Sequence, residues 1–129
     1  MLVVYGIANC DSVKKARAWL QSEAAACEFH DFKRVGLDEA RLDHWIAAVG
    51  WERLLNRRGT TWRRLGDAAR AAATDAAGAR ALMLEAPSLV KRPVVEWPDG
   101  TVSVGFDAGR FAELRRLNLG LSAAHAASS

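Results

Sequence analysis

A strand pattern, a helix pattern and a second strand pattern open the chain, and this order constrains the fold more than any other feature. Residues 2–5 (Leu-Val-Val-Tyr) form an apolar run. Apolar residues then recur at helical spacing from Asp11 to about Glu23, and Cys27–Phe32 alternates like a half-buried strand. This succession predicts a right-handed βαβ unit, and therefore an α/β protein.

The middle of the chain, about residues 36–86, carries helical patterns and no strand pattern. Asp38 and Thr60 are expected to cap two of these helices, and Gly59 to let the chain turn into the second. Helices are predicted over residues 38–49, 51–56, 60–65, 67–72 and 74–85. We therefore expect a helical insertion between two halves of one sheet.

A hairpin and a helix are predicted after the insertion. Residues 94–97 and 102–104 flank Asp99-Gly100, which is a strong hairpin signal. Pro93 at the first residue of a strand keeps its missing N–H out of the ladder, and the peptide bond before it is a candidate for the cis form. The sheet core should thus run βαβ and then ββα.

The last predicted helix spans Asp107–Leu117, with Phe111, Leu114 and Leu117 facing inward. Residues 118–129 are small and polar, and we expect a mobile tail there. Half of the 129 residues are hydrophobic, which is enough for one good core. We therefore expect residues 1–117 to form a single domain.

Cys10 lies between the first strand and the first helix. The free N–H groups and partial positive charge of a helix N-terminus stabilise a thiolate, which is the nucleophilic form. Lys14 and Lys15 lie within about one turn and should lower the thiol pKa further, although Asp11 acts against this. We predict that Cys10 is the catalytic nucleophile, and the alternative is an ordinary buried thiol.

Cys27 is expected to be structural. In a C-x-x-C arrangement the partner of Cys10 would stand at position 13, which is Val13. A disulfide at Cys10 must then be resolved from outside, by a small thiol such as glutathione or by a redoxin. A Cys10–Cys27 bridge stays open at this point, and it would need Cα atoms within about 7 Å.

Two groups of arginines are candidates for anion binding. Arg92 has a planar guanidinium suited to an oxyanion or a carboxylate, and the alternative is a solvated loop arginine. Four arginines lie within residues 57–64. Charge runs are usually solvated, so we assign a function there only to Arg57 or Arg58 and none to Arg63 and Arg64.

Charge and composition exclude several functions. The net charge of +3 comes from 18 basic and 15 acidic residues, without the basic stripe of a nucleic-acid binder. No secretory signal or membrane span is visible, so we expect a cytoplasmic protein that binds no membrane. His30, His44 and His125 have no ligand spacing, which predicts no metal site.

Three segments in order, Tyr5–Leu20, Arg58–Trp62 and Lys91–Pro93, resemble the ArsC/Spx (arsenate reductase-like) family, and most closely its YffB subgroup. The likeness runs from about Met1 to Leu117. It implies a thioredoxin-like core with a helical insertion, Cys10 as the active thiol, and Arg92 before a cis-proline.

The resemblance also bears on the reaction. Arsenate reductases of this type use three arginines to hold the oxyanion beside the cysteine. Of these, only Arg92 lines up here, and Asn56 and Gly105-Phe106 fall where the other two are expected. Spx-type regulators with a redox switch carry C-x-x-C, which Val13 breaks. The YffB subgroup is thought to bind glutathione and to reduce disulfides with it.

The leading hypothesis is a thiol oxidoreductase, namely a glutathione-dependent thiol/disulfide reductase with glutathione as co-substrate and no bound cofactor. Its predicted substrate- and glutathione-binding residues are Asn9, Lys14, Arg58, Arg92 and Pro93. The carboxylates of glutathione suit the arginines, and its backbone could pair with the residue before Pro93. Cys10 would attack a disulfide, which could belong to a protein, or another electrophile, and the sequence does not name it.

Two alternatives stay open. One is an arsenate reductase that depends on glutathione or glutaredoxin. The other is an Spx-like regulator that binds RNA polymerase through the helical insertion. The sequence does not fix the oligomeric state.

Overall fold

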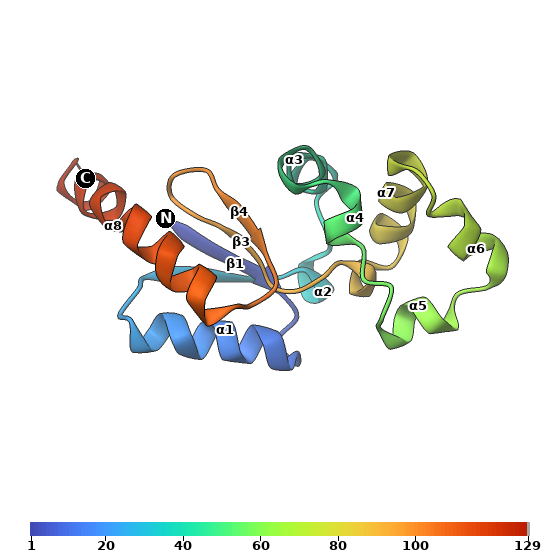
Figure 1. Ribbon diagram of the computed structural model, residues 1–129, viewed down its shortest axis with the longest axis horizontal. Coiled ribbons are helices and arrows are strands. Elements are labelled where there is room, and N and C mark those ends of the chain that lie inside the picture. Colours follow the sequence, from blue (N-terminus) through green and yellow to red (C-terminus); the bar gives the residue numbers. More distant parts are fainter. Residues whose placement is uncertain (129) are drawn as a thin grey trace. The chain divides into compact units, whose positions relative to one another are not determined.

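The computed structural model describes residues 1–128, and their side chains as far as Leu119. The chain forms two compact units. The first, the sheet unit, combines residues 1–31 with residues 92–129; the second, the helical unit, is Phe32–Lys91 (Figure 1). The expectation of a single domain over residues 1–117 stays a prediction.

The sheet unit contains four strands in the order β2-β1-β3-β4. Strand β1 (Leu2–Gly6) runs parallel to β2 (Cys27–Asp31) and antiparallel to β3 (Val94–Glu96), which pairs antiparallel with β4 (Val102–Val104). Helix α1 (Asp11–Ser22) connects the two parallel strands, and α8 (Ala108–Ser128) follows β4. The predicted α/β class, with βαβ and then ββα, is confirmed.

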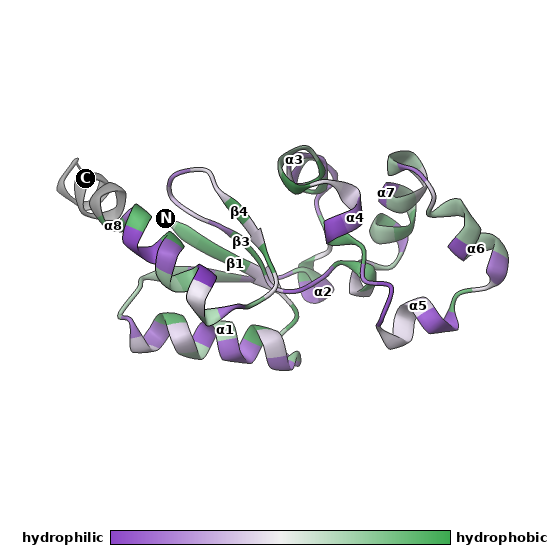
Figure 2. Cartoon of the chain, in the orientation of Figure 1, coloured by the Kyte–Doolittle hydropathy of each residue, from purple (hydrophilic) through white to green (hydrophobic). Residues whose placement is uncertain are grey.

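One face of this sheet carries the core. Alternate residues of a strand point to the same face, so Leu2 and Val4 share a face, as do Val95 and Trp97. Helices α1 and α8 pack against that face (Figure 1), and Figure 2 colours β1 as a hydrophobic strand. Phe111 of α8 meets the Trp97 ring edge-on, with ring centroids 5.3 Å apart.

The end of β1 approaches the first turn of α1 very closely. A Cβ atom on the buried Gly6 would lie 2.6 Å from Cγ2 of Val13, which is itself fully buried. No pair of carbon atoms tolerates that distance without movement. Glycine at position 6 therefore lets the strand end directly against the helix that follows Cys10.

The helical unit contains six α-helices and one 3₁₀-helix among the described residues. Asp38 and Asp75 cap two of them, accepting the N–H of Arg41 at 2.9 Å and of Gly78 at 2.8 Å. Fully buried Trp45, Leu54 and Met83 form part of its core. The helices are α2 (Phe32–Val35), α3 (Glu39–Val49), α4 (Trp51–Leu54), α5 (Thr60–Arg64), α6 (Asp67–Ala72), α7 (Ala76–Glu85) and η1 (Pro87–Leu89). The predicted helical insertion is confirmed.

Two local predictions in this segment are wrong. Strand β2 ends at Asp31, and the buried Phe32 begins α2 instead of ending the strand. Thr60 is the first residue of α5, and Gly59 occupies the N-cap position without a side-chain hydrogen bond. A Cβ at position 59 would lie 2.8 Å from Nδ2 of Asn56, so this amide would have to move to admit one.

The end of the last helix also differs from the prediction. Helix α8 continues to Ser128, and Leu117 is 56% exposed instead of facing inward. Asn118 is buried: its Oδ1 accepts the N–H of Asp99 at 2.8 Å and its Nδ2 donates to the carbonyl of Leu114 at 2.7 Å. Asn118 therefore belongs to the packed part of α8, and a mobile tail over residues 118–129 stays a prediction. The side chains from residue 120 onward, and residue 129, lie outside the described part.

The close contact at Gly6 predicts a sensitive position. Replacing Gly6→Ala should lower the free energy of unfolding by about 1–3 kcal/mol, because the new methyl group overpacks against Val13. Urea unfolding followed by tryptophan fluorescence measures this change. The same substitution in a Val13→Ala background should cost much less, since the obstructing methyl groups are gone. An equal cost in both backgrounds would refute the steric explanation.

Candidate active site around Cys10

Cys10 is the N-cap residue of α1. Its backbone is extended, with φ −137° and ψ 126°, and its carbonyl accepts the N–H of Lys14 at 2.9 Å as the first bond of the helix. The loop before it is tied to the end of β2, because Oδ2 of Asp31 accepts the N–H of Ala8 at 3.3 Å. The thiol therefore lies between the end of the inner strand β1 and the N-terminus of α1.

The pKa of the Cys10 thiol is lowered from its ordinary value. Partial burial by itself raises this pKa, since a charged sulfur loses water. Hydrogen bonding to the backbone N–H of Val13, then hydrogen bonding and charge from Arg92, and last the N–H of Ser12, lower it by more. The site thus favours the nucleophilic thiolate.

The lysines that were expected to lower the pKa of Cys10 do not cause this shift. Lys14 and Lys15 are not among the groups that lower the pKa of Cys10. Both side chains are exposed, where water screens their charge, and Nζ of Lys14 donates to Oδ1 of Asn9 at 3.5 Å. Lys14 and Asn9 therefore lie beside one another at the surface next to Cys10, and their binding role stays a prediction.

Arg92 reaches Cys10 from the segment just before β3, which pairs with β1. The Arg92–Pro93 peptide bond is cis, as expected, and Pro93 is buried just before β3. The carbonyl of Pro93 accepts the N–H of Gly105 at 2.8 Å, which fixes this turn to the end of β4. The half-buried guanidinium of Arg92 then hydrogen-bonds the sulfur of Cys10.

Cys27 lies at the opposite end of β1. It pairs with Leu2, the first residue of β1, whereas Cys10 follows the last one. Both thiols are free, so the bridge left open by the sequence is absent. Burial of its sulfur raises the pKa of Cys27, although Arg17 counteracts this, and the residue as a whole is exposed. Cys27 thus lacks the groups that activate Cys10.

The arginines of residues 57–64 belong to the helical unit. The guanidinium of Arg57 lies over the rings of Trp51 and Trp62, at 5.7 and 5.6 Å, and donates to the carbonyl of Ala73 at 3.1 Å. Arg57 therefore ties this unit together. Arg58 is exposed, and its backbone N–H donates to Oδ1 of Asn56 at 3.0 Å. Its predicted binding role stays a prediction.

Gly105 and Phe106 stand where the resemblance places a third arginine. Gly105 has φ +83°, in the left-handed region that side chains rarely adopt. The Phe106 ring packs edge-on against Phe111 with centroids 4.9 Å apart. An arginine at either position would lose this geometry, so aromatic packing replaces a second cation.

Asp31 and the backbone donors of the first turn were missed by the sequence analysis. An aspartate at the end of a predicted strand that leads back beside the Cys10 loop was the one available signal. The N–H groups of Ser12 and Val13 carry no side-chain signature.

Among the described residues, no cluster of His, Cys, Asp or Glu could hold a metal ion. None of the helices that the structure describes is long and apolar enough to span a membrane.

A thioredoxin-like sheet with one activated thiol at the N-terminus of its first helix and a cis-proline opposite defines a class of thiol-dependent, reductase-like proteins. Within that class, the chain belongs to the ArsC family, whose model matches residues 5–114.

Three relatives support this assignment. The solved structure of a YFFB protein is 46% identical, covers 88% of this chain and 98% of its own, and has a TM-score of 0.83. An arsenate reductase (ArsC) related protein from Brucella melitensis is 50% identical, with coverage of 85% and 90% and a TM-score of 0.69. An uncharacterized protein from Haemophilus influenzae is 39% identical over 107 residues, which span 83% of this chain and 92% of that protein.

The contact between Arg92 and Cys10 predicts a change in thiol acidity. Replacing Arg92→Met removes a hydrogen bond and a positive charge that favour the thiolate, so the pKa of Cys10 should rise. The rate of alkylation of Cys10, followed by mass spectrometry, should then reach half its maximum at a higher pH than in the wild type.

Lys14→Met is the matched control for this experiment. It removes a neighbouring cation that does not lower the pKa of Cys10, so its alkylation profile should match the wild type. Cys27 serves as an internal reference in every sample. If Lys14→Met raised the pKa of Cys10 as much as Arg92→Met, the assignment of the shift to Arg92 would be wrong.

Proposed function

We propose that this protein is a glutathione-dependent thiol/disulfide reductase that works with the single cysteine Cys10. The observation that carries the proposal is the lowered pKa of Cys10 together with Val13 at the position of a resolving cysteine. A thiolate without a neighbouring thiol forms a mixed disulfide that it cannot release by itself. An external thiol must complete the cycle, and glutathione is the simplest one.

The proposed cycle consists of three thiol–disulfide exchanges. The Cys10 thiolate attacks one sulfur of a disulfide, forms a mixed disulfide and expels the other sulfur as a thiolate. A first glutathione attacks the Cys10 sulfur, releases the bound half of the substrate and remains attached to Cys10. A second glutathione attacks the attached glutathione sulfur, giving oxidised glutathione and the free Cys10 thiolate. The two glutathione thiols supply the protons that the two released thiolates take up.

The residues of the sheet unit have distinct roles in this cycle. The N–H groups of Ser12 and Val13 and the guanidinium of Arg92 stabilise Cys10 whenever it leaves as a thiolate. Arg92 also offers donors to a carboxylate of glutathione. The backbone next to Pro93 receives the extended cysteinyl segment, and Asn9 and Lys14 border the sulfur at the surface. A redoxin could replace glutathione, and the substrate disulfide could belong to a protein.

Arsenate reduction is the second candidate, because the Brucella melitensis relative is named an arsenate reductase related protein. An arsenate ion carries two negative charges and favours several cations around the attacking sulfur. In the sheet unit, Arg92 is joined by Gly105 and Phe106 instead of a further arginine. This chemistry favours a disulfide, which brings no charge to the sulfur, over the oxyanion.

A turnover assay tests the proposal directly. With bis(2-hydroxyethyl) disulfide and glutathione, Cys10→Ser should reduce turnover to the uncatalysed rate, because the serine hydroxyl is not ionised at neutral pH. Cys27→Ser is the matched control and should retain wild-type turnover, since Cys27 lies at the far end of β1. Activity that survives Cys10→Ser, or disappears with Cys27→Ser, would contradict the proposal.

Trapping of the intermediate distinguishes the donor thiol and the substrate. Oxidised glutathione should add one glutathione to Cys10, detected by peptide mass spectrometry, and the adduct should disappear with excess glutathione. Arg58→Gln tests the predicted role of Arg58 through the KM for glutathione. Arsenite release from arsenate that requires Cys10, in the absence of disulfide reduction, would instead support the arsenate reductase.

A further inference from the structure

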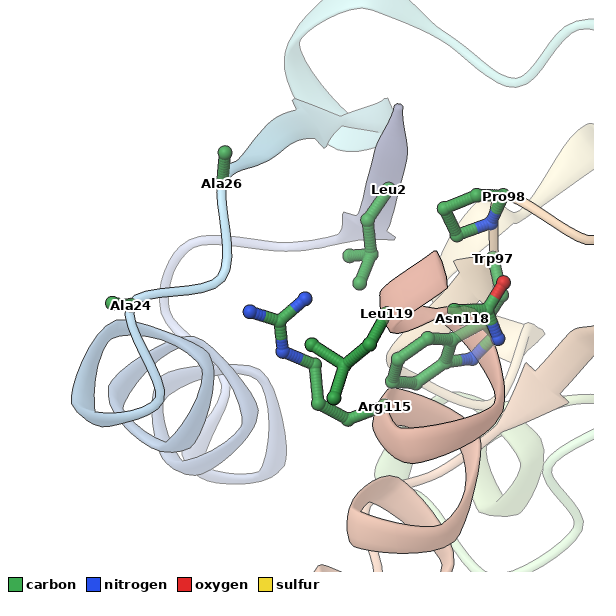
Figure 3. Close-up of a pocket in the computed structure, with 8 residues that line it drawn as sticks. All are labelled: Leu2, Ala24, Ala26, Trp97, Pro98, Arg115, Asn118 and Leu119. Atoms are coloured by element: carbon green, nitrogen blue, oxygen red, sulfur yellow. The ribbon is translucent and has the colours of Figure 1, made fainter. Parts of the chain in front are cut away.

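A pocket opens in the sheet unit at the end of the sheet remote from Cys10. Its volume is about 330 Å³, which is within the range of small-molecule sites. It lies between the start of β1, the loop between α1 and β2, the turn after β3, and α8 (Figure 3). Its lining residues are Leu2, Ala24, Ala26, Trp97, Pro98, Arg115, Asn118 and Leu119.

The chemistry of this lining is apolar with one cation. Among the described residues that line the pocket, Arg115 is the one charged side chain. Figure 3 shows its guanidinium between Leu2 and the loop that carries Ala24 and Ala26. Its Nη2 donates to the carbonyl of Glu23 at 3.5 Å. A guanidinium has five N–H donors, and this bond uses one of them.

The other polar groups of the pocket are occupied. The buried Asn118 uses Oδ1 for the N–H of Asp99 and Nδ2 for the carbonyl of Leu114. The indole N–H of Trp97 donates to Oγ of Ser103 at 2.9 Å. The Asp99 carboxylate is turned toward the N–H of Thr101, which Oδ1 accepts at 2.9 Å. A ligand in this pocket therefore contacts apolar walls and one cationic side chain, Arg115, which can bind an anion.

The wall itself contains an unusual backbone conformation. Ala24 has φ +52°, a left-handed conformation that favours glycine. Its N–H donates to the carbonyl of Gln21 at 3.0 Å, which ends α1 and starts the loop along the pocket. Leu119, 49% exposed, forms the facing wall on α8. These positions place apolar surface on both sides of the guanidinium.

We propose that this pocket binds a small monocarboxylate with an apolar chain. The carboxylate pairs with the guanidinium of Arg115, and the chain lies between Leu2 and Leu119. A carboxylate suits the fork of N–H donors, and one negative charge matches one cation. Binding here is independent of the proposed reductase, because Cys10 lies at the other end of β1.

Octanoate and 1-octanol form the test pair, because they share a chain length and differ in the charged head group. Titration of the whole protein is followed by two-dimensional ¹H–¹⁵N NMR, reading the amides of Ala24 and Ala26 and the indole of Trp97. We expect saturable shifts with octanoate and binding about tenfold weaker with 1-octanol, as the loss of a charge-assisted hydrogen bond implies.

Variants of α8 assign the binding to named side chains. Arg115→Gln should weaken octanoate about tenfold and leave 1-octanol unchanged, because it removes only the charged partner. Arg116→Gln is the matched control: the neighbouring arginine is exposed and does not line this pocket, so both affinities should stay at wild type. Leu119→Ser should weaken both ligands, since it shortens the apolar wall.

Several results would overturn the proposal. They are shifts that grow without saturation, equal affinity for the two ligands in the wild type, and an unchanged octanoate affinity in Arg115→Gln. A second copy of the chain in the pocket would shift the same amides with protein concentration alone, and sedimentation would show the dimer. The alkylation profile of Cys10 in Arg115→Gln should match the wild type, which shows that the sheet unit is folded.

Discussion

The contact between Gly6 and Val13 is the constraint on which the rest of the Cys10 site depends. Because the strand ends directly against the first helical turn, the N-terminus of α1 has one position relative to the sheet. That position brings the N–H groups of Ser12 and Val13 to the sulfur of Cys10. Strand β3 pairs with β1, so the same sheet also delivers Arg92 and Pro93 to this end.

The sequence was sufficient to predict the elements of the fold but not the source of the thiol acidity. Strand and helix periodicity located the βαβ and ββα parts, and Asp38 marked a helix start that the structure contains. Lys14 and Lys15 were the charges visible near Cys10 in the sequence. The groups that act are backbone donors, which no residue letter records, and Arg92, which only tertiary folding brings near.

The remaining errors have a common physical cause, which is that long-range packing decided positions where local patterns were ambiguous. Leu117 fits the inward spacing of α8, yet Asn118 is the buried residue, because it joins the turn at Asp99 to the helix. In the helical unit, Arg57 looked like a ligand-binding cation. The indoles of Trp51 and Trp62 are near Arg57 in the sequence, but only the fold places both rings against its guanidinium, and the carbonyl that it binds belongs to the more distant Ala73.

The two thiols of the sheet unit differ in pKa because of where each lies in the fold. Both are partly withdrawn from water, and this raises the pKa of each. At Cys10 two backbone donors and a hydrogen-bonded guanidinium outweigh that effect, whereas at Cys27 the charge of Arg17 does not. Because β1 separates them along its whole length, neither thiol can resolve a disulfide formed by the other. In the proposed cycle, such a chain takes its second thiol from solution, and Arg92 is the residue proposed to bind it.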